Sequence, residues 1–139
     1  MQMTKLPRRG PVLIVDDDET FLKSLSEIIE SWGYHVLKTT RGKEALQIIR
    51  KKPVEAVLLD FQMPEMNGIE CLGYIHRDYP QVSVVMITGC SFELQDFIDL
   101  GAAWALQKPF DPALLRQLLD KLPGPCNFNE AISHVSVNP

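Results

Sequence analysis

The chain has 139 residues and a formal net charge of −4, with 45% hydrophobic and 23% charged residues. This composition is ordinary for one globular domain with a hydrophobic core, and the lack of a basic stripe argues against direct binding of nucleic acid. The longest apolar stretches are strand-sized and the N-terminus lacks an apolar signal-peptide core. We therefore expect a cytoplasmic protein that does not span a membrane.

Five apolar runs alternate with five helical patterns along the chain. The runs fall at about residues 12–15, 35–39, 55–59, 82–87 and 102–107. Continuous apolar strands separated by helices are typical of a parallel sheet that helices cover on both faces. With right-handed crossovers, we expect an α/β fold in which five parallel strands form a doubly wound open sheet with five helices.

Capping and turn residues mark where several helices begin and end. Gly33 suits the left-handed position after the first helix, and Ser91 can cap the fourth. Asp111 followed by Pro112 opens the fifth helix. The first helix has one apolar face, made of Phe21, Leu25, Ile28, Ile29 and Trp32. Its spacing predicts that this face turns toward the core.

The regular pattern covers residues 11–122, which we interpret as one domain. Residues 1–10 contain three basic side chains and are interpreted as a solvated, flexible arm. Residues 123–139 show no sustained period and are interpreted as a tail or a truncated linker, too short to hold an output domain.

Polar and charged residues follow four of the five apolar runs. Asp16 and Asp17 follow the first run, and Asp60 follows the third. Thr88 ends the fourth run, and Lys108 follows the fifth. The carboxyl ends of parallel strands meet at one edge of an open sheet, where such folds bind ligands. Grouped carboxylates repel one another unless a cation such as Mg²⁺ neutralises them, so the pattern favours a metal site that handles phosphoryl groups.

Each of these residues also has an ordinary structural explanation. Asp18 is expected to cap the first helix, and the neighbouring acidic residues could do no more than that. Asp60 could be a turn residue, and Thr88 could be a β-branched strand residue. Lys108 could be a surface lysine before a proline that fixes the corner. Taken singly, each residue is weak support for a site.

The order of these residues after successive strands is more specific, and it resembles the receiver domain of bacterial response regulators. The motifs that carry the resemblance are VLIVDDD, LLDFQMPEMNG, MITG and GAAWALQKPF. The match covers roughly residues 11 to 122. It implies a flavodoxin-like (βα)5 receiver that signals in a two-component phosphorelay and is not an enzyme beyond catalysing its own phosphorylation and dephosphorylation.

The resemblance implies that Asp60 is the phosphoacceptor. A sensor histidine kinase or a histidine phosphotransfer protein would donate the phosphoryl group from a phosphohistidine. Asp17 would bind Mg²⁺ directly, and Asp16 would bind it mainly through water. Asp60 and the backbone carbonyl of Gln62 would complete the ligands from the protein.

The resemblance also assigns roles to the other strand-end residues. Lys108 would supply positive charge, and Thr88 would move toward the new phosphoryl group. This movement would pull the face formed by the fourth helix, the fifth strand and the fifth helix, so the output would be a population shift between two packings. A homodimer through the fourth and fifth helices is a further expectation, with Phe92 and Trp104 exposed there.

The chain departs from the family pattern three residues before the lysine. Receivers usually carry Tyr or Phe at that position, whereas this chain has Ala105, with Trp104 one residue earlier. Neighbouring strand residues point to opposite faces, so we do not expect Trp104 to act as the rotating switch of the family. We expect it to be packed under a helix or exposed at an interface.

Gln62 and Cys90 stand at positions that tune dephosphorylation in the family. Their identities imply a phosphoryl lifetime that differs from that of the fast chemotaxis regulators. We hypothesise that Gln62 controls the access of the attacking water.

Two other functions fit parts of the sequence. The segment DDDET resembles the D-x-D-x-T nucleophile motif of haloacid-dehalogenase-like phosphatases, with Asp16 as the nucleophile. That family needs a late acidic pair, which nothing after Lys108 offers, and it would leave Asp60 without a role. The other alternative is a receiver-like interaction module that signals without phosphorylation.

Overall fold

The computed structural model describes residues 11–89 and 94–122. Within these residues one sheet holds five strands: β1 (Val12–Val15), β2 (Val36–Thr39), β3 (Ala56–Asp60), β4 (Ser83–Thr88) and β5 (Trp104–Gln107). All neighbouring pairs are parallel, in the order β2-β1-β3-β4-β5. The predicted doubly wound sheet is confirmed. Its strand order reverses between β1 and β3, which is where an open α/β sheet forms its binding crevice.

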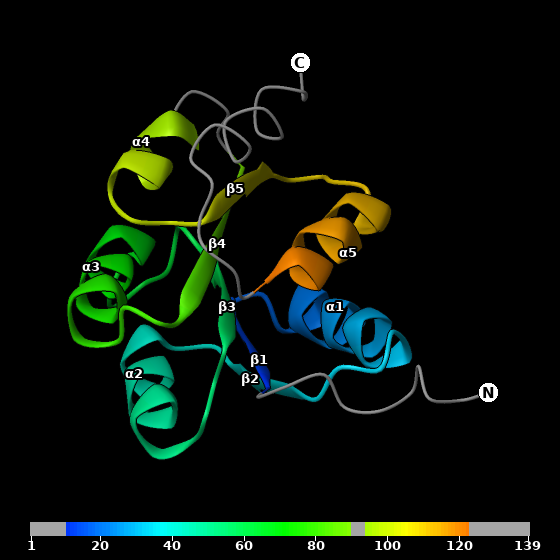
Figure 1. Cartoon of the computed structure of the whole chain (residues 1–139), viewed down its shortest axis with the longest axis horizontal. Coiled ribbons are helices and arrows are strands. Elements are labelled where there is room, and N and C mark those ends of the chain that lie inside the picture. The colour runs from blue at the N-terminus through cyan, green and yellow to red at the C-terminus, as the bar shows by residue number, and fades with distance from the viewer. Residues whose placement is uncertain (1–10, 90–93, 123–139) are drawn as a thin grey trace.

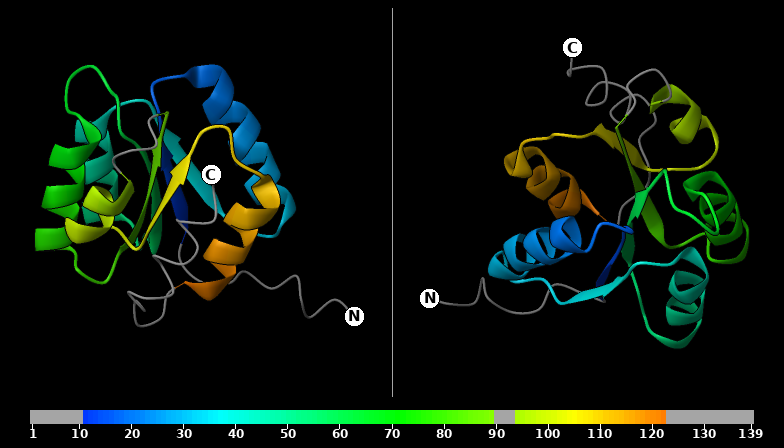
Figure 2. Two further views of the ribbon diagram at one scale, coloured as in Figure 1. Left: turned by 90° about the horizontal axis from the view of Figure 1, so that it is seen from above. Right: turned by 180° about the vertical axis from the view of Figure 1, so that it is seen from behind.

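In the described part of the chain, five helices connect and follow the strands: α1 (Glu19–Ser31), α2 (Gly42–Lys51), α3 (Gly68–Asp78), α4 (Leu94–Asp99) and α5 (Pro112–Lys121). Helices α1 and α5 cover one face of the sheet, and α2, α3 and α4 cover the other (Figure 1). Both further views show the same three layers, with the sheet in the middle (Figure 2). The central strands are therefore shielded on both faces, and Val57, Leu58 and Leu59 of β3 are fully buried.

Polar residues before the helices satisfy free amide groups of the first turn. Asp18 accepts hydrogen bonds from two amides of α1, at 3.0 and 3.2 Å. Asp111 caps α5, with Pro112 at the first helical position. Both caps are as predicted from the sequence, and Asn67 caps α3 in the same way. Gly33 ends α1 with a φ of 98°, the left-handed conformation predicted for it.

The apolar face of α1 turns toward the core only in part. Leu25 and Ile29 are buried as predicted, but Leu22 and Ser26 complete the buried stripe. The other residues of the predicted face are half-buried: Phe21, Ile28 and Trp32. The reason is that α1 has two neighbours, the sheet beneath it and α5 with its preceding turn beside it. One part of the predicted apolar face therefore packs on the sheet, and the other part packs on α5 and its preceding turn.

The arm predicted for residues 1–10 and the tail predicted for residues 123–139 lie outside the described residues. The same is true of Cys90, of the predicted helix cap Ser91 and of Phe92. In the part of the chain that is described, no helix is both long enough and apolar enough to cross a bilayer.

Candidate functional site

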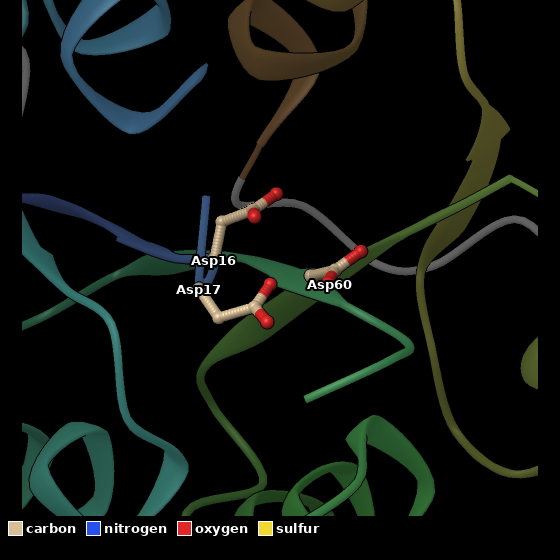
Figure 3. A group of neighbouring side chains, drawn as sticks. All are labelled: Asp16, Asp17 and Asp60. Carbon is tan, nitrogen blue, oxygen red and sulfur yellow. The ribbon is translucent and has the colours of Figure 1, made fainter. Parts of the chain in front are cut away.

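Three aspartates meet at the carboxyl edge of the sheet. Asp16 and Asp17 directly follow β1, and Asp60 is the last residue of β3. Because β1 and β3 are paired neighbours, oxygens of the three carboxylates lie within 4.8 Å of one another. Figure 3 shows them grouped at the two strand ends. Asp16 and Asp60 are buried, whereas Asp17 is exposed to solvent.

Lys108 reaches the same place from the end of β5. Its Nζ lies 2.9 Å from Oδ2 of Asp16 and 3.6 Å from Oδ1 of Asp60. Its backbone amide donates to the carbonyl oxygen of Thr88 at 2.7 Å, which ties it to the end of β4. Burial by itself lowers the pKa of Lys108, but the hydrogen bond to Asp16 and the charge of Asp60 outweigh burial and raise the pKa.

The Asp60 carboxyl has a raised pKa of about 6. Burial is the largest cause, followed by the negative charge of Asp16, while Lys108 acts in the opposite direction. Three carboxylates and the single ammonium of Lys108 leave an excess of negative charge at the strand ends. At neutral pH, Asp60 is still mainly ionised and therefore nucleophilic.

The oxygen donors and the charge of this site suit a hard divalent cation. Two carboxylates are buried and one is open to solvent, and Mg²⁺ prefers such oxygens together with waters. Gln62 is exposed in the turn after β3, where it lines an open cleft of about 470 Å³ with Asp17. The fold thus brings Gln62 near the group of three aspartates, which its predicted role as a Mg²⁺ ligand requires.

Thr88 ends β4 and is almost completely buried. Its strand neighbour Ile87 pairs with Asp60 of β3, and Thr88 itself pairs with Gln107 of β5. Thr88 therefore lies between the strand ends that carry Asp60 and Lys108. This is the position that the sequence predicted for it.

The expected exposure of Trp104 at an interface is wrong, and its packing under a helix is confirmed. Trp104 is 5% exposed, and the ammonium of Lys121 in α5 lies 5.9 Å from the centre of its ring. Trp104 therefore faces α5. Ala105 is fully buried and points to the opposite face of the sheet, as alternation along a strand requires.

The sequence did not predict three contacts around the site. The ring of Phe21 lies against Lys108, and the ring of Phe61 lies against Phe97 of α4. Gly68 approaches the backbone of Asp60 closely. Each contact joins residues from different elements, so the apolar periodicity of one element does not reveal it.

A sequence profile of the response regulator receiver domain matches residues 12–120, more than half of the chain. The chain belongs to this family. The chain is 33% identical over 129 residues to the transcriptional regulatory protein ZraR of Klebsiella oxytoca, and this match covers 91% of this chain and 27% of ZraR. It is 34% identical over 102 residues to CpxR of Escherichia coli strain K12, covering 72% of this chain and 43% of CpxR. The chain thus spans between a quarter and a half of the length of these relatives.

Solved structures agree with this assignment. The chain resembles a CheY-like receiver domain protein from Methanospirillum hungatei JF-1, with a TM-score of 0.75, 31% identity and coverage of 91% of this chain and 98% of that one. It also resembles the response regulator TrrA of Thermotoga maritima, solved in complex with Mg²⁺ and beryllium fluoride, with a TM-score of 0.76 and 27% identity. That match covers 81% of this chain and 97% of TrrA.

These comparisons support the receiver over the phosphatase alternative. The geometry agrees, because both carboxylate oxygens of Asp16 already have partners in the protein. Oδ2 pairs with Lys108, and Oδ1 accepts a hydrogen bond from the amide of Asp18 at 2.9 Å. A buried carboxylate engaged in this way is poorly placed to attack a substrate.

Proposed function

We propose that this receiver accepts a phosphoryl group on Asp60 from the phosphohistidine of a sensor histidine kinase or a histidine phosphotransfer protein. The observation that supports this most is the meeting of Asp16, Asp17, Asp60 and Lys108 at one sheet edge. A carboxylate oxygen of Asp60 would form the new O–P bond while the P–N bond to the donor imidazole breaks. The imidazole nitrogen keeps the electron pair, and the product is an acyl phosphate.

The acidic group is the proposed Mg²⁺ site of the receiver. Asp17 would hold the ion directly and Asp16 mainly through water, with Asp60 and the backbone carbonyl of Gln62 as the remaining ligands. When bound, Mg²⁺ would neutralise the negative charge of the phosphoryl oxygens. Asp17 is the exposed member of the group, so it is the carboxylate most accessible to an ion arriving from solvent.

Lys108 and Thr88 would respond to the new phosphoryl group. The Lys108 ammonium is paired with carboxylates before transfer and would pair with a phosphoryl oxygen afterwards. Thr88 would turn its hydroxyl toward the phosphoryl group and shift the end of β4. Because the backbone amide of Lys108 donates a hydrogen bond to the carbonyl of Thr88, the ends of β4 and β5 would move together. The output is a population shift in the face made by α4, β5 and α5.

An apolar groove beside the site is the proposed place where the donor docks. The groove holds about 440 Å³ between α1 and the turn before α5. Phe21, Ile28, Phe110 and Lys108 are among the residues that line it. A donor helix seated there would bring its phosphohistidine close to the acidic group. We also propose that the receiver acts in the cytoplasm, and a homodimer through α4 and α5 stays a prediction.

Labelling with a small phosphodonor tests the proposed function. Acetyl phosphate with Mg²⁺ should add one phosphoryl group to the receiver, and borohydride reduction with peptide mass spectrometry should place it on Asp60. Asp60→Asn should remove the label, whereas Asp78→Asn, an exposed aspartate on α3, should retain it. A label on Asp16 would favour the phosphatase chemistry. An unlabelled protein whose Asp60→Asn variant keeps full partner binding would favour a phosphorylation-independent module.

A further inference from the structure

The ammonium of Lys108 lies over the ring of Phe21, with Nζ 4.2 Å from the ring centre. On its other sides Nζ faces Asp16 at 2.9 Å and Asp60 at 3.6 Å. The Lys108 side chain is 29% exposed, so water is available to it as an alternative to this position. The aromatic face therefore closes one side of the site in which the ammonium sits.

Phe21 is itself held in place from two directions. It lies in the first turn of α1, where its amide donates to Oδ1 of Asp18 at 3.2 Å. Its ring packs edge to face on Phe110, with centroids 6.4 Å apart and planes at 85°. Phe110 follows Lys108 by two residues, so the turn that carries the lysine also carries the ring that supports Phe21.

A lysine side chain has a flexible four-carbon stem and a strongly hydrated charge, so its ammonium can occupy many positions. The negative face of an aromatic ring attracts an ammonium that lies over it. A ring fixed by the α1 cap and by Phe110 therefore favours the conformations of Lys108 that point at the two carboxylates. An aliphatic side chain of similar size would fill the space without this attraction.

We infer that Phe21 is a positioning residue for phosphoryl transfer, which acts by holding the Lys108 ammonium over Asp16 and Asp60. The inference rests on the proposed function for its effect on phosphorylation. The placement of the ammonium itself is independent of that function. Phe21 touches neither the phosphoacceptor nor the proposed metal ligands in any contact described for it; its action is through Lys108.

The test compares Phe21→Tyr with Phe21→Leu. A ring face over the lysine shifts the ε-methylene protons of Lys108 upfield, and NMR of the unphosphorylated protein measures this shift. We expect wild type and Phe21→Tyr to show the upfield shift and Phe21→Leu to lose it. With acetyl phosphate and Mg²⁺, the rate of Asp60 phosphorylation should fall about 3- to 10-fold in Phe21→Leu and stay within about twofold in Phe21→Tyr.

Trp32→Leu is the matched control, because Trp32 directly follows α1 and its ring also lies under a cation, with the guanidinium carbon of Arg116 5.6 Å from the ring centre. It should leave the phosphorylation rate within about twofold of wild type. Ring fluorination of Phe21 is a second test that keeps the shape of the side chain, and the rate should fall stepwise as fluorine atoms are added. This series stays informative even if Phe21→Leu folds poorly. Acetyl phosphate avoids any effect of these variants on the docking of a protein donor.

The possible outcomes distinguish a failure of the role of Phe21 from a failure of the proposed phosphorylation of Asp60. An unchanged rate in folded Phe21→Leu, or a rate in Phe21→Tyr as low as in Phe21→Leu, would overturn the role of the aromatic face. Absence of the upfield shift in wild type would overturn the placement itself. If the shift is present but no label reaches Asp60, the proposed function fails, and with it the role of Phe21 in transfer, while the placement of Lys108 stands.

Discussion

A Cβ atom at Gly68 would lie 2.7 Å from the backbone carbonyl oxygen of Asp60. It would also lie 2.8 Å from the Cα of Phe61 and 2.9 Å from the Cε of Met86. The amide of Gly68 donates to the carbonyl of Phe61 at 2.8 Å, so α3 begins directly against the strand end that carries the proposed phosphoacceptor. Because two of the close atoms belong to the backbone, a side chain at Gly68 would have to displace Asp60.

Gly68→Ala should therefore destabilise the receiver, by about 1–3 kcal/mol in the free energy of unfolding measured with urea. Gly73→Ala on the exposed side of the same helix is the control, because a Cβ there meets nothing within 4 Å. It should stabilise the receiver by about 0.5–1 kcal/mol, since alanine is the better helix former. Equal effects of the two substitutions would show that the approach of Gly68 to Asp60 is not tight.

The raised pKa of Asp60 predicts a dependence of stability on pH. In the folded state the pKa of Asp60 is about 6, against an ordinary value of 3.8. Between about pH 4 and pH 6 the folded state retains a proton that the unfolded state has lost, so this group's contribution to stability falls as pH rises. Asp60→Asn removes the titration. In Mg²⁺-free buffer, the free energy of unfolding of the Asp60→Asn variant, relative to that of wild type, should rise by about 1–3 kcal/mol between pH 4 and pH 7.

Asp78→Asn is the control for this experiment. Asp78 is exposed, and its hydrogen bond with Arg77 lowers its pKa instead of raising it. It should show no such rise across the same pH range. A difference between Asp60→Asn and wild type that stays constant from pH 4 to pH 7 would mean that Asp60 has an ordinary pKa.

Mg²⁺ should stabilise the folded receiver, because it neutralises carboxylates that the fold holds within 4.8 Å of one another. A ligand that binds the folded state alone adds about 2.7 kcal/mol at 100 times its Kd. Mg²⁺ should therefore raise the melting temperature of the wild-type receiver. Asp17→Asn should lose most of this rise, since it removes a carboxylate and leaves the ion pair of Asp16 with Lys108 intact. Melting curves with increasing Mg²⁺ at constant ionic strength measure this effect.

Asp96→Asn, an exposed substitution on α4, should retain the full response to Mg²⁺. If Asp17→Asn also retained it, the stabilisation would come from general screening of charge, and the proposed metal site would be wrong.

Phe61 and Phe97 should be coupled in stability. Their ring centroids are 5.2 Å apart and their planes are inclined at 55°, and Phe97 of α4 is fully buried. Phe61 directly follows Asp60, so this pair joins the strand end to α4. A double-mutant cycle with Phe61→Leu and Phe97→Leu should give a coupling energy of about 0.5–1.5 kcal/mol in urea unfolding.

A cycle of Phe61→Leu with Trp32→Leu is the comparison, because Trp32 directly follows α1. Helix α1 covers the face of the sheet opposite to α4 (Figure 1). These two changes should be additive within about 0.5 kcal/mol. Additive changes at Phe61 and Phe97 would remove the ring contact as a link between the site and α4.

The sheet edge could be predicted because a parallel sheet sends all its carboxyl strand ends to the same side. Asp16, Asp60 and Lys108 each follow or end an apolar run, so the run boundaries were enough to predict that they meet. The caps Asp18 and Asp111 could be predicted for a similar reason, since a cap acts within three residues of itself. Helix caps and the direction of the strands can therefore both be predicted from the sequence.

The faces of α1 and β5 were harder to predict. Periodicity shows which residues share one side of an element, but not how many neighbours that side has. Phe21 meets Lys108 and Phe110 because α1 lies beside the turn before α5. Trp104 is buried because α5 covers its side of the sheet at the edge strand. The expected exposure of Trp104 failed for this reason.

By itself the sequence determined the order of strands and helices and the residues that stand at each strand end, because apolar runs and capping residues act over a few neighbours. Only the tertiary structure decided that Lys108 lies between Asp16 and Phe21, and that Gly68 touches the backbone of Asp60. The contacts of Lys108 join elements far apart in the chain, and the contact of Gly68 joins the successive elements β3 and α3. Their distances depend on how whole layers pack against each other, which no local pattern encodes.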